Sequence, residues 1–546
     1  MKEDCGDKGN QFADMEDKLR NLRSLITHAQ DAQSDMQVIV NTLRETYQFP
    51  ESYLIDTDIA VNLKQIRDIV SPSDDITIRE FTITALGLRA AIVFVEYMTD
   101  EESISQNILS QLMLPTISGK CTDTSQLMEC IRSSLTASAV NGTTDMAEII
   151  KRLLSGDTVL FVDTIATALV ITTRKLKTRP ISVPMSEPTI RGPQDAFTES
   201  LGVNITLLRR RLVNPNFIVK KLAIGVRSEN TVALLYFRGI TNPNLVYQAE
   251  ERLNKLTVDI VGSTGLVENL IEAHPFSPFP TLFATERPDK VMAALMDGKI
   301  AIMVDGTPFV ILAPTTLGDF MQAGDDYYEN WIVGSLLRMT RYFAAFFAMV
   351  TPALYVAVTT FHPGLLPTPL TLTIAAARMG VPFPALIEAI LMEIILEILQ
   401  EAGVRMPKTI GPAVSIVGGL VLGDAAVRAG LVSAPIVVVI SFTAIVSFAI
   451  GNYRLSLPLR FFRIPLMLAA SVLGMFGVVM GLVAIIVHLS MLESFGEPYL
   501  APFTPKNSSR LSDWKDSIVV APPVAMTTRP AYLEPGDSEK LGDKNG

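Results

Sequence analysis

The sequence has few cysteines and histidines and lacks the short motifs of the common enzyme classes. Its three cysteines form no CxxC pair, and an odd count does not indicate a disulfide framework, so a reducing compartment suits them best. None of the four histidines has the HExxH spacing of zinc proteases. No Walker A run is present, because Gly119-Lys120 lacks the upstream glycine and the following Ser or Thr, and no GxGxxG follows a strand-like segment. We therefore expect no enzymatic activity, no cofactor and no metal site.

An excess of basic charge and an N-terminal signal segment are also missing. The formal net charge is -10 at neutral pH, so nucleic acid is not an expected partner. Residues 1–30 are polar and contain no apolar signal-peptide core. We therefore expect the N-terminal half to stay in the cytoplasm, with the first apolar span inserting the chain.

Long apolar runs dominate the chain from residue 331 to about residue 490. Residues 342–361 carry no charge and are about long enough to cross a bilayer, and residues 431–451 and 464–489 repeat the pattern. Before residue 330 the charges are scattered as in a water-soluble protein, and after residue 490 the chain turns polar and proline-rich. This division predicts a water-soluble head on an all-α, multi-span transmembrane domain that contacts membrane lipid.

The number of crossings stays open at this point. Two further apolar segments lie at 385–402 and 411–427. A basic loop is expected before the last span, and it carries Arg454, Arg460 and Arg463. Because positive flanks favour the cytoplasmic side, four crossings between Arg341 and this loop would place both basic regions inside. A fifth crossing would put the tail outside, and a re-entrant segment would change that count.

The head contains a duplication. Residues 145–171 and 289–312 both read as amphipathic helix, glycine, apolar strand, Val-Asp turn and apolar strand. Residues at the same offset in the two copies are Gly156 with Gly298 and Asp163 with Asp305. The strand pairs and helices upstream, which open near Asp100 and Asn242 as N-caps, align at nearly that offset. The pattern predicts an α+β head of two similar subdomains, with the Val-Asp turns serving structure rather than a ligand.

The resulting division of the chain has six parts. They are an N-terminal helical segment 1–74, a first α+β subdomain 75–172, a linker and helix 173–215, a second α+β subdomain 216–330, a transmembrane helical domain 331–490 and a polar tail 491–546. The linker part ends in Arg209, Arg210 and Arg211, which read as a solvated or interface helix. The alternative is a basic contact to anionic lipid or to an acidic neighbour.

Carboxylates within the membrane half are the strongest chemical signal. The apolar segment LIEAILMEIILEILQEAG places three of them on one face of a helix, within an arc of roughly 80°: Glu393, Glu397 and Glu401. A carboxylate that faces lipid costs several kcal/mol, so these side chains must face protein or water. One reading is a cation path lined by carboxylates. The other is a set of buried ion pairs, for which the candidate charges are Glu388, Arg378, Arg405, Asp424 and Arg428.

Three long segments resemble one known family. They are TIRGPQDAFTESLGVNITLLRRRL (189–212), TERPDKVMAALMDGKIAIMVDGTPFVIL (285–312) and DDYYENW (325–331). They are similar to the A-subunit family of spore germinant receptors, the GerA family of endospore-forming bacteria, over nearly the whole chain from about residue 75 to the tail. The resemblance implies a protein of the spore inner membrane that helps to start germination and works with a transporter-like B subunit and a lipoprotein C subunit.

The same resemblance implies a mechanism. A subunits of this family are thought to assemble as homo-oligomeric rings that form a ligand-gated ion channel, with the nutrient bound by the B subunit. Two other functions compete with this interpretation: a secondary transporter, which broken helices and carboxylates in the membrane would suit, and a non-conducting scaffold. The sequence does not separate a nutrient receptor from an auxiliary paralogue in the same membrane.

Overall fold

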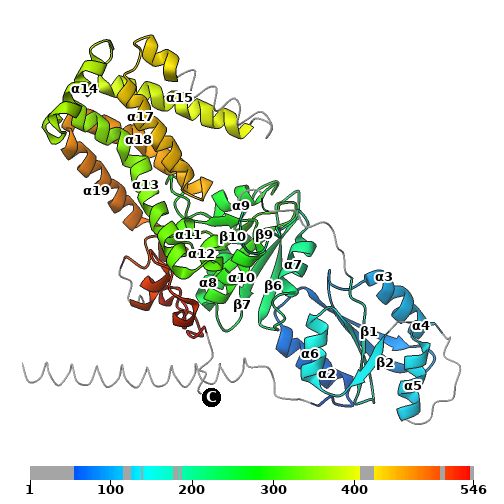
Figure 1. Ribbon diagram of the computed structural model, residues 1–546. Helices are drawn as coiled ribbons and strands as arrows, with labels where there is room; N and C mark the ends of the chain where they lie inside the picture. The colour runs from blue at the N-terminus through cyan, green and yellow to red at the C-terminus, as the bar shows by residue number, and fades with distance from the viewer. Residues whose placement is uncertain are drawn as a thin grey trace, which may run out of the picture.

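The computed structural model describes residues 54–540 except for 115–123, 137–138, 176–183, 185–186, 406–422 and 505–510 (Figure 1). The head, which precedes residue 331, has two α+β units, and a bundle of long helices follows it. Residues 1–53 of the expected N-terminal helical segment and most of the apolar segment 411–427 lie outside the described residues.

The first unit is a five-stranded antiparallel sheet between two layers of helices. Its strands are β1 (Ile76–Ile83), β2 (Leu88–Val95), β3 (Val140–Thr143), β4 (Thr158–Val162) and β5 (Ala168–Ile171), in the order β1-β2-β4-β5-β3. Alternate residues of β2 and β4 point to opposite faces, as the period of a strand requires. One face packs on α2 (Ile59–Val70) and α6 (Met146–Leu154). The other packs on η1 (Ile104–Leu109), α4 (Ser110–Met113) and α5 (Thr124–Ser134), which follow the short α3 (Glu101–Ser103).

The second unit repeats this arrangement. Its strands are β6 (Phe217–Ile224), β7 (Asn230–Phe237), β8 (Phe283–Thr285), β9 (Ile300–Val304) and β10 (Val310–Ala313), in the order β6-β7-β9-β10-β8. One face packs on α8 (Pro243–Asn254) and α9 (Thr264–Ile271), and the other on α7 (Leu201–Arg209) and α10 (Pro288–Asp297). The strand order is the one found in the first unit, as the predicted duplication requires.

The two Val-Asp turns have equivalent structural roles. The Asp163 carboxylate accepts a hydrogen bond from the backbone N–H of Ile59, the first residue of α2. The Asp305 carboxylate accepts one from Leu201, the first residue of α7, across the same separation of 104 residues. Each aspartate therefore satisfies a free N–H at a helix start, and α2 and α7 are equivalent helices of the two copies. The glycines paired by the duplication, Gly156 and Gly298, both have positive φ, which explains why glycine recurs there.

Several polar contacts join the two units. Arg209, fully buried, forms an ion pair with the equally buried Asp75, with Nε to Oδ2 at 2.8 Å. Arg238 donates to the backbone carbonyls of Ile69 and Ser71 at the end of α2. Of the basic run that ends α7, Arg209 therefore meets an acidic neighbour in the first unit rather than lipid.

One cysteine departs from the expectation. Cys130 in α5 is disulfide-bonded. The odd cysteine count gave no sign of a disulfide framework, but three cysteines still allow one pair.

The helical region is built around α13. The short α11 (Leu317–Met321) and α12 (Asp325–Tyr328) lead into it, and its long helices are α13 (Trp331–Thr360), α14 (Thr368–Arg378), α15 (Ala385–Arg405), α17 (Ala434–Phe448), α18 (Tyr453–Leu473) and α19 (Met475–Met491). Helix α13 packs against α15, α17, α18 and α19. Two of these, α13 and α18, are long and apolar enough to cross a membrane, and α17 and α19 are shorter apolar helices.

Two expectations about the last span are wrong. Residues 464–489 are not one helix, because Gly474, with φ +62° and ψ -140°, separates α18 from α19. The three arginines expected in a basic loop, Arg454, Arg460 and Arg463, lie within α18 instead. The chain therefore runs away from the head along α18 and back toward the head along α19, where His488 contacts Ser277 of the head.

The tail accordingly lies on the same side as the head (Figure 1). It begins with the hairpin β11 (Glu493–Ser494) and β12 (Glu497–Pro498) and continues through the short helices η3 (Leu511–Asp516), η4 (Pro523–Ala525) and η5 (Ala531–Leu533). Arg529 donates to the carbonyl of Met296 at the end of α10, and the N–H of Gly536 donates to the carbonyl of Ile240. A fifth crossing that would put the tail on the far side is therefore excluded.

Candidate functional site

Helix α15 carries the predicted carboxylates, and α18 supplies partners for two of them. Glu393 is buried and forms an ion pair with Arg463, with Nη1 to Oε1 at 2.5 Å and side chains 6% and 0% exposed. Four residues further along α15, Glu397 pairs with Arg460. Since Glu393 meets Arg463 and Glu397 meets Arg460, the two helices run antiparallel at this place.

Arg463 also compensates for a proline in α13. Pro352 lies inside that helix and has no N–H, so the carbonyl of Ala348, four residues earlier, lacks its helical partner. The Nε of Arg463 donates to this carbonyl at 2.7 Å. One arginine thereby ties α13, α15 and α18 together.

The Arg460 pair is less enclosed. Its Nη1 donates to both carboxylate oxygens of Glu397, at 3.1 and 3.3 Å, and to the side-chain carbonyl of Gln400 at 2.5 Å. The Glu397 side chain is 50% exposed although Arg460 is 9% exposed. Glu397 therefore combines a bound counter-charge with an open side.

The buried pair retains unused hydrogen-bonding capacity. Within the described part of the chain, neither Oε2 of Glu393 nor Nη2 of Arg463 has a hydrogen-bond partner. A buried charge pair stabilises a protein only when its remaining donors and acceptors are also satisfied. A water molecule between these atoms would supply the missing bonds.

Glu388 has a different setting near the far ends of the helices. It is fully buried and accepts hydrogen bonds from the backbone N–H and the hydroxyl of Ser433, at 3.0 and 2.8 Å. Ser433 is the N-cap of α17, where a negative charge is favoured by the helix dipole. Arg378 of α14 pairs with the same carboxylate at 3.2 Å. Glu388 of α15 thus connects α14 and α17 through its carboxylate.

The other candidate charges lie elsewhere. Asp424 and Arg428 pair with each other, four residues apart, with side chains 55% and 80% exposed, so the expectation that they are buried partners is wrong. On an exposed helix face such a pair is satisfied without a buried partner. Glu401 is exposed near the end of α15, and the side chain of Arg405 lies outside the described residues.

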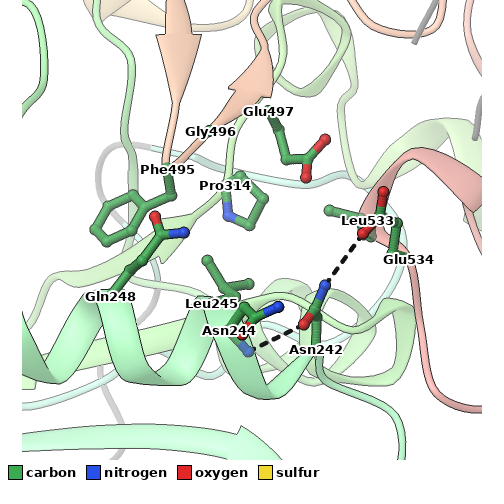
Figure 2. A pocket seen from close by; sticks show the side chains of 10 residues that line it. All are labelled: Asn242, Asn244, Leu245, Gln248, Pro314, Phe495, Gly496, Glu497, Leu533 and Glu534. Carbon is green, nitrogen blue, oxygen red and sulfur yellow. Dashed lines mark hydrogen bonds between the residues drawn. The ribbon is translucent and has the colours of Figure 1, made fainter. Parts of the chain in front are cut away.

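A small polar pocket lies away from this cluster (Figure 2). It has a volume of about 170 Å³ and lies where the start of α8 meets the β11–β12 turn and the tail. Asn242 caps α8 as expected, accepting from the N–H of Asn244, and its amide points to Glu534 of the tail at 3.5 Å. Asp100, the equivalent residue of the first unit, makes no side-chain cap bond and pairs with Lys175 instead.

Comparison with known proteins decides the family. The sequence profile described as Bacillus/Clostridium GerA spore germination protein matches residues 64–532. The chain belongs to this family. The resemblance inferred from the three motifs is confirmed, and membership in the GerA family supports the expectation that the chain is not an enzyme.

Several known proteins are similar to this chain. It is 37% identical to spore germination protein GerLA of Bacillus cereus, over 87% of this chain and 96% of that protein. It is 39% identical to uncharacterized membrane protein YfkQ of Bacillus subtilis, over 89% of this chain and 93% of that protein. The solved N-terminal domain of the A subunit of the Bacillus megaterium spore germinant receptor GerK3 is 32% identical and covers 48% of this chain and 97% of its own, with a TM-score of 0.37. With its two candidate spans, this GerA-family chain is a membrane protein.

Sequence reasoning missed the two arginines that define this GerA-family site. Arg460 and Arg463 were assigned to a loop, although they lie three residues apart in the apolar run LPLRFFRIPLML. Residues three apart share a helix face, and charges inside an apolar helix require partners. The spacing of Glu393 and Glu397 on α15 offered those partners, so the two patterns taken together could have predicted the pairing.

Proposed function

We propose that this chain is the A subunit of a spore germinant receptor in the spore inner membrane. Its head lies in the cytoplasm, and it acts with a transporter-like B subunit and a lipoprotein C subunit. Several copies form a ring around a pore that releases cations when nutrient is sensed. In this proposal the chain is divided largely as the sequence predicts, except that α2 belongs to the first unit and α7 to the second, and the helices between residues 331 and 490 form a multi-span membrane domain.

The observation that supports a cation path is the position of Glu397. Its carboxylate is half exposed on α15, one turn from the buried Glu393. Rings of carboxylates concentrate cations and exclude anions. In a ring, one α15 from each subunit would bring Glu397, with Glu393 behind it and Glu401 at the helix end, to a shared axis.

The outer face of α15 suits contact with a neighbour or with lipid. Its exposed side chains include the apolar Ile387, Ile394 and Ile398, beside the exposed Glu397 and Glu401. A closed ring uses the same two surfaces on every subunit, so a face of this kind is available for one of them. The proposal therefore includes contacts between copies through the helical region.

The test is electrical recording of the full-length chain in planar lipid bilayers with a potassium chloride gradient. We expect conductance steps whose reversal potential shows potassium passing in preference to chloride. Glu397→Gln keeps the side-chain size and removes the charge, so it should lower this cation preference by about threefold or more. Glu251→Gln is the matched control, because Glu251 lies in an exposed pair with Lys255 in the head and should leave the preference unchanged.

Two results would contradict the proposal. Complete absence of conductance steps from assembled protein would favour a non-conducting scaffold. Ion movement that requires the gradient of a second solute would favour a secondary transporter.

A further inference from the structure

Helix α18 contacts both the head and the carboxylates of α15. At its first turn, Arg454 forms an ion pair with Glu268 of helix α9 in the head. Glu268 is 3% exposed, so the contact is enclosed on the head side. About one and a half to two and a half turns further on, the same helix presents Arg460 to Glu397 and Arg463 to Glu393.

The distances along α18 are short. At 1.5 Å per residue, Arg460 lies about 9 Å and Arg463 about 14 Å from the level of Arg454. A shift or rotation of the head-bound end of α18 therefore reaches both pairs within about three helical turns.

Two prolines lie beside the arginines. Pro458 and Pro465 are inside α18, one before Arg460 and one after Arg463. Each removes a helical N–H and leaves the carbonyl four residues earlier without its helical donor, which weakens the helix at that point. The segment that carries both arginines is thus bounded by two weakened turns, and it can change its angle at less cost than an uninterrupted helix.

The charges of the four side chains cancel in this arrangement. Arg463 neutralises Glu393 and Arg460 neutralises Glu397, so a cation gains little from either carboxylate while the pairs are intact. When α18 moves away, the carboxylates lose their counter-charges and attract cations.

We propose that α18 is the latch of the cation path: its arginines neutralise the α15 carboxylates at rest, and the Glu268–Arg454 contact transmits the state of the head to them. This inference rests on the proposed function, because it describes how the same path is regulated. It assigns Arg460 and Arg463 as counter-charges and Glu268 and Arg454 as coupling residues.

The test is single-channel recording of the full-length chain, which separates how often a pore opens from what passes through it. Arg460→Gln removes one counter-charge, and Glu268→Gln releases the head-bound end of α18. We expect each to raise the open probability by about fivefold or more, the lower end of known coupling between sites. The double exchange Glu268→Arg with Arg454→Glu should return the open probability toward that of the wild type. Arg227→Gln, which removes an exposed ion pair of the head, should leave it unchanged.

The outcomes distinguish the latch from the path. Conductance with an unchanged open probability in both single variants overturns the latch and leaves the proposed function standing. An effect of Arg460→Gln without any effect of Glu268→Gln overturns the transmission from the head. Absence of conductance in the wild type and in every variant, at normal assembly by gel filtration, refutes the proposed function itself.

Discussion

At the level of single residues, buried ion pairs connect structural elements that lie far apart in the sequence. Arg209 meets Asp75 between the two units of the head, and Arg463 meets Glu393 between α18 and α15. Removing one partner of such a pair leaves a buried charge uncompensated, which costs about 3–5 kcal/mol. These pairs therefore fix which elements lie together more than they add to net stability.

The ion pair between Glu268 and Arg454 can be tested by how the thermal stability of the protein depends on pH. Burial raises the pKa of Glu268 above its ordinary value near 4.5, and Arg454 offsets part of this rise. A carboxyl whose pKa is raised in the folded state stabilises the fold most below its unfolded pKa, and this stability is lost as the pH rises through the folded value. The wild type should therefore lose thermal stability relative to Glu268→Gln between about pH 4.5 and neutrality, by of order 2 °C.

The measurement is thermal unfolding of both proteins in detergent across that pH range. Glu251→Gln, at an exposed carboxylate, should follow the wild type at every pH. If Glu268→Gln instead lost stability relative to the wild type as the pH rose, the folded pKa of Glu268 would be lowered, and the ion pair would dominate over burial.

At the level of elements, the turn between α18 and α19 depends on one glycine. Gly474 has positive φ together with ψ -140°, a region that is essentially restricted to glycine. A Cβ built there would lie 2.8 Å from Cε1 of His362 and 3.0 Å from Cβ of Phe361, at the end of α13. The turn is therefore both strained for other residues and closely packed.

We expect Gly474→Ala to destabilise the helical region by about 2–4 kcal/mol, the sum of backbone strain and a clash with a packed neighbour. Differential scanning fluorimetry of the detergent-solubilised protein measures the loss as a lower midpoint. Gly451→Ala is the matched control, because its Cβ would have no atom within 4 Å. Equal midpoints for the two variants would show that the turn relaxes and that the α18–α19 hairpin does not depend on this glycine.

The same turn shows where prediction from the sequence ends. The apolar run 464–489 conceals the break, because a glycine inside an apolar run is usually compatible with a continuous helix. The duplication, in contrast, was predictable from offset alone, since Gly156 and Gly298 occupy equivalent left-handed positions. That α2 belongs to the first copy and α7 to the second could not be predicted from the offset, because it depends on hydrogen bonds to Asp163 and Asp305 across 104 residues. The shared face of Glu393 and Glu397 follows from helix geometry, whereas their partners on α18 follow from tertiary packing.

At the level of the whole molecule, the chain returns to its own head. Helix α13 leaves the head, α19 comes back to it, and the tail then packs over the place where α13 begins (Figure 1). The central residue of this joint is Arg338, fully buried in α13, which pairs with Asp326 at 3.2 Å and with Asp516 of the tail at 2.8 Å. Ser335, one turn earlier in α13, exchanges hydrogen bonds with the backbone of Val520.

The tail is therefore expected to hold the head and α13 at a fixed angle. Asp516→Ala removes one of the two carboxylates on a buried guanidinium and should lower the free energy of unfolding by about 1–3 kcal/mol, because Asp326 remains as partner. It should also speed proteolytic cleavage of the tail, because the tail loses its charged contact to α13 and keeps backbone hydrogen bonds there. Lys515→Ala, next in sequence, is the control and should change neither measurement. Asp516→Ala could instead match the control in both unfolding free energy and cleavage rate. In that case Asp326 of α12 would be enough to position Arg338, and the tail would not contribute to the angle between the head and α13.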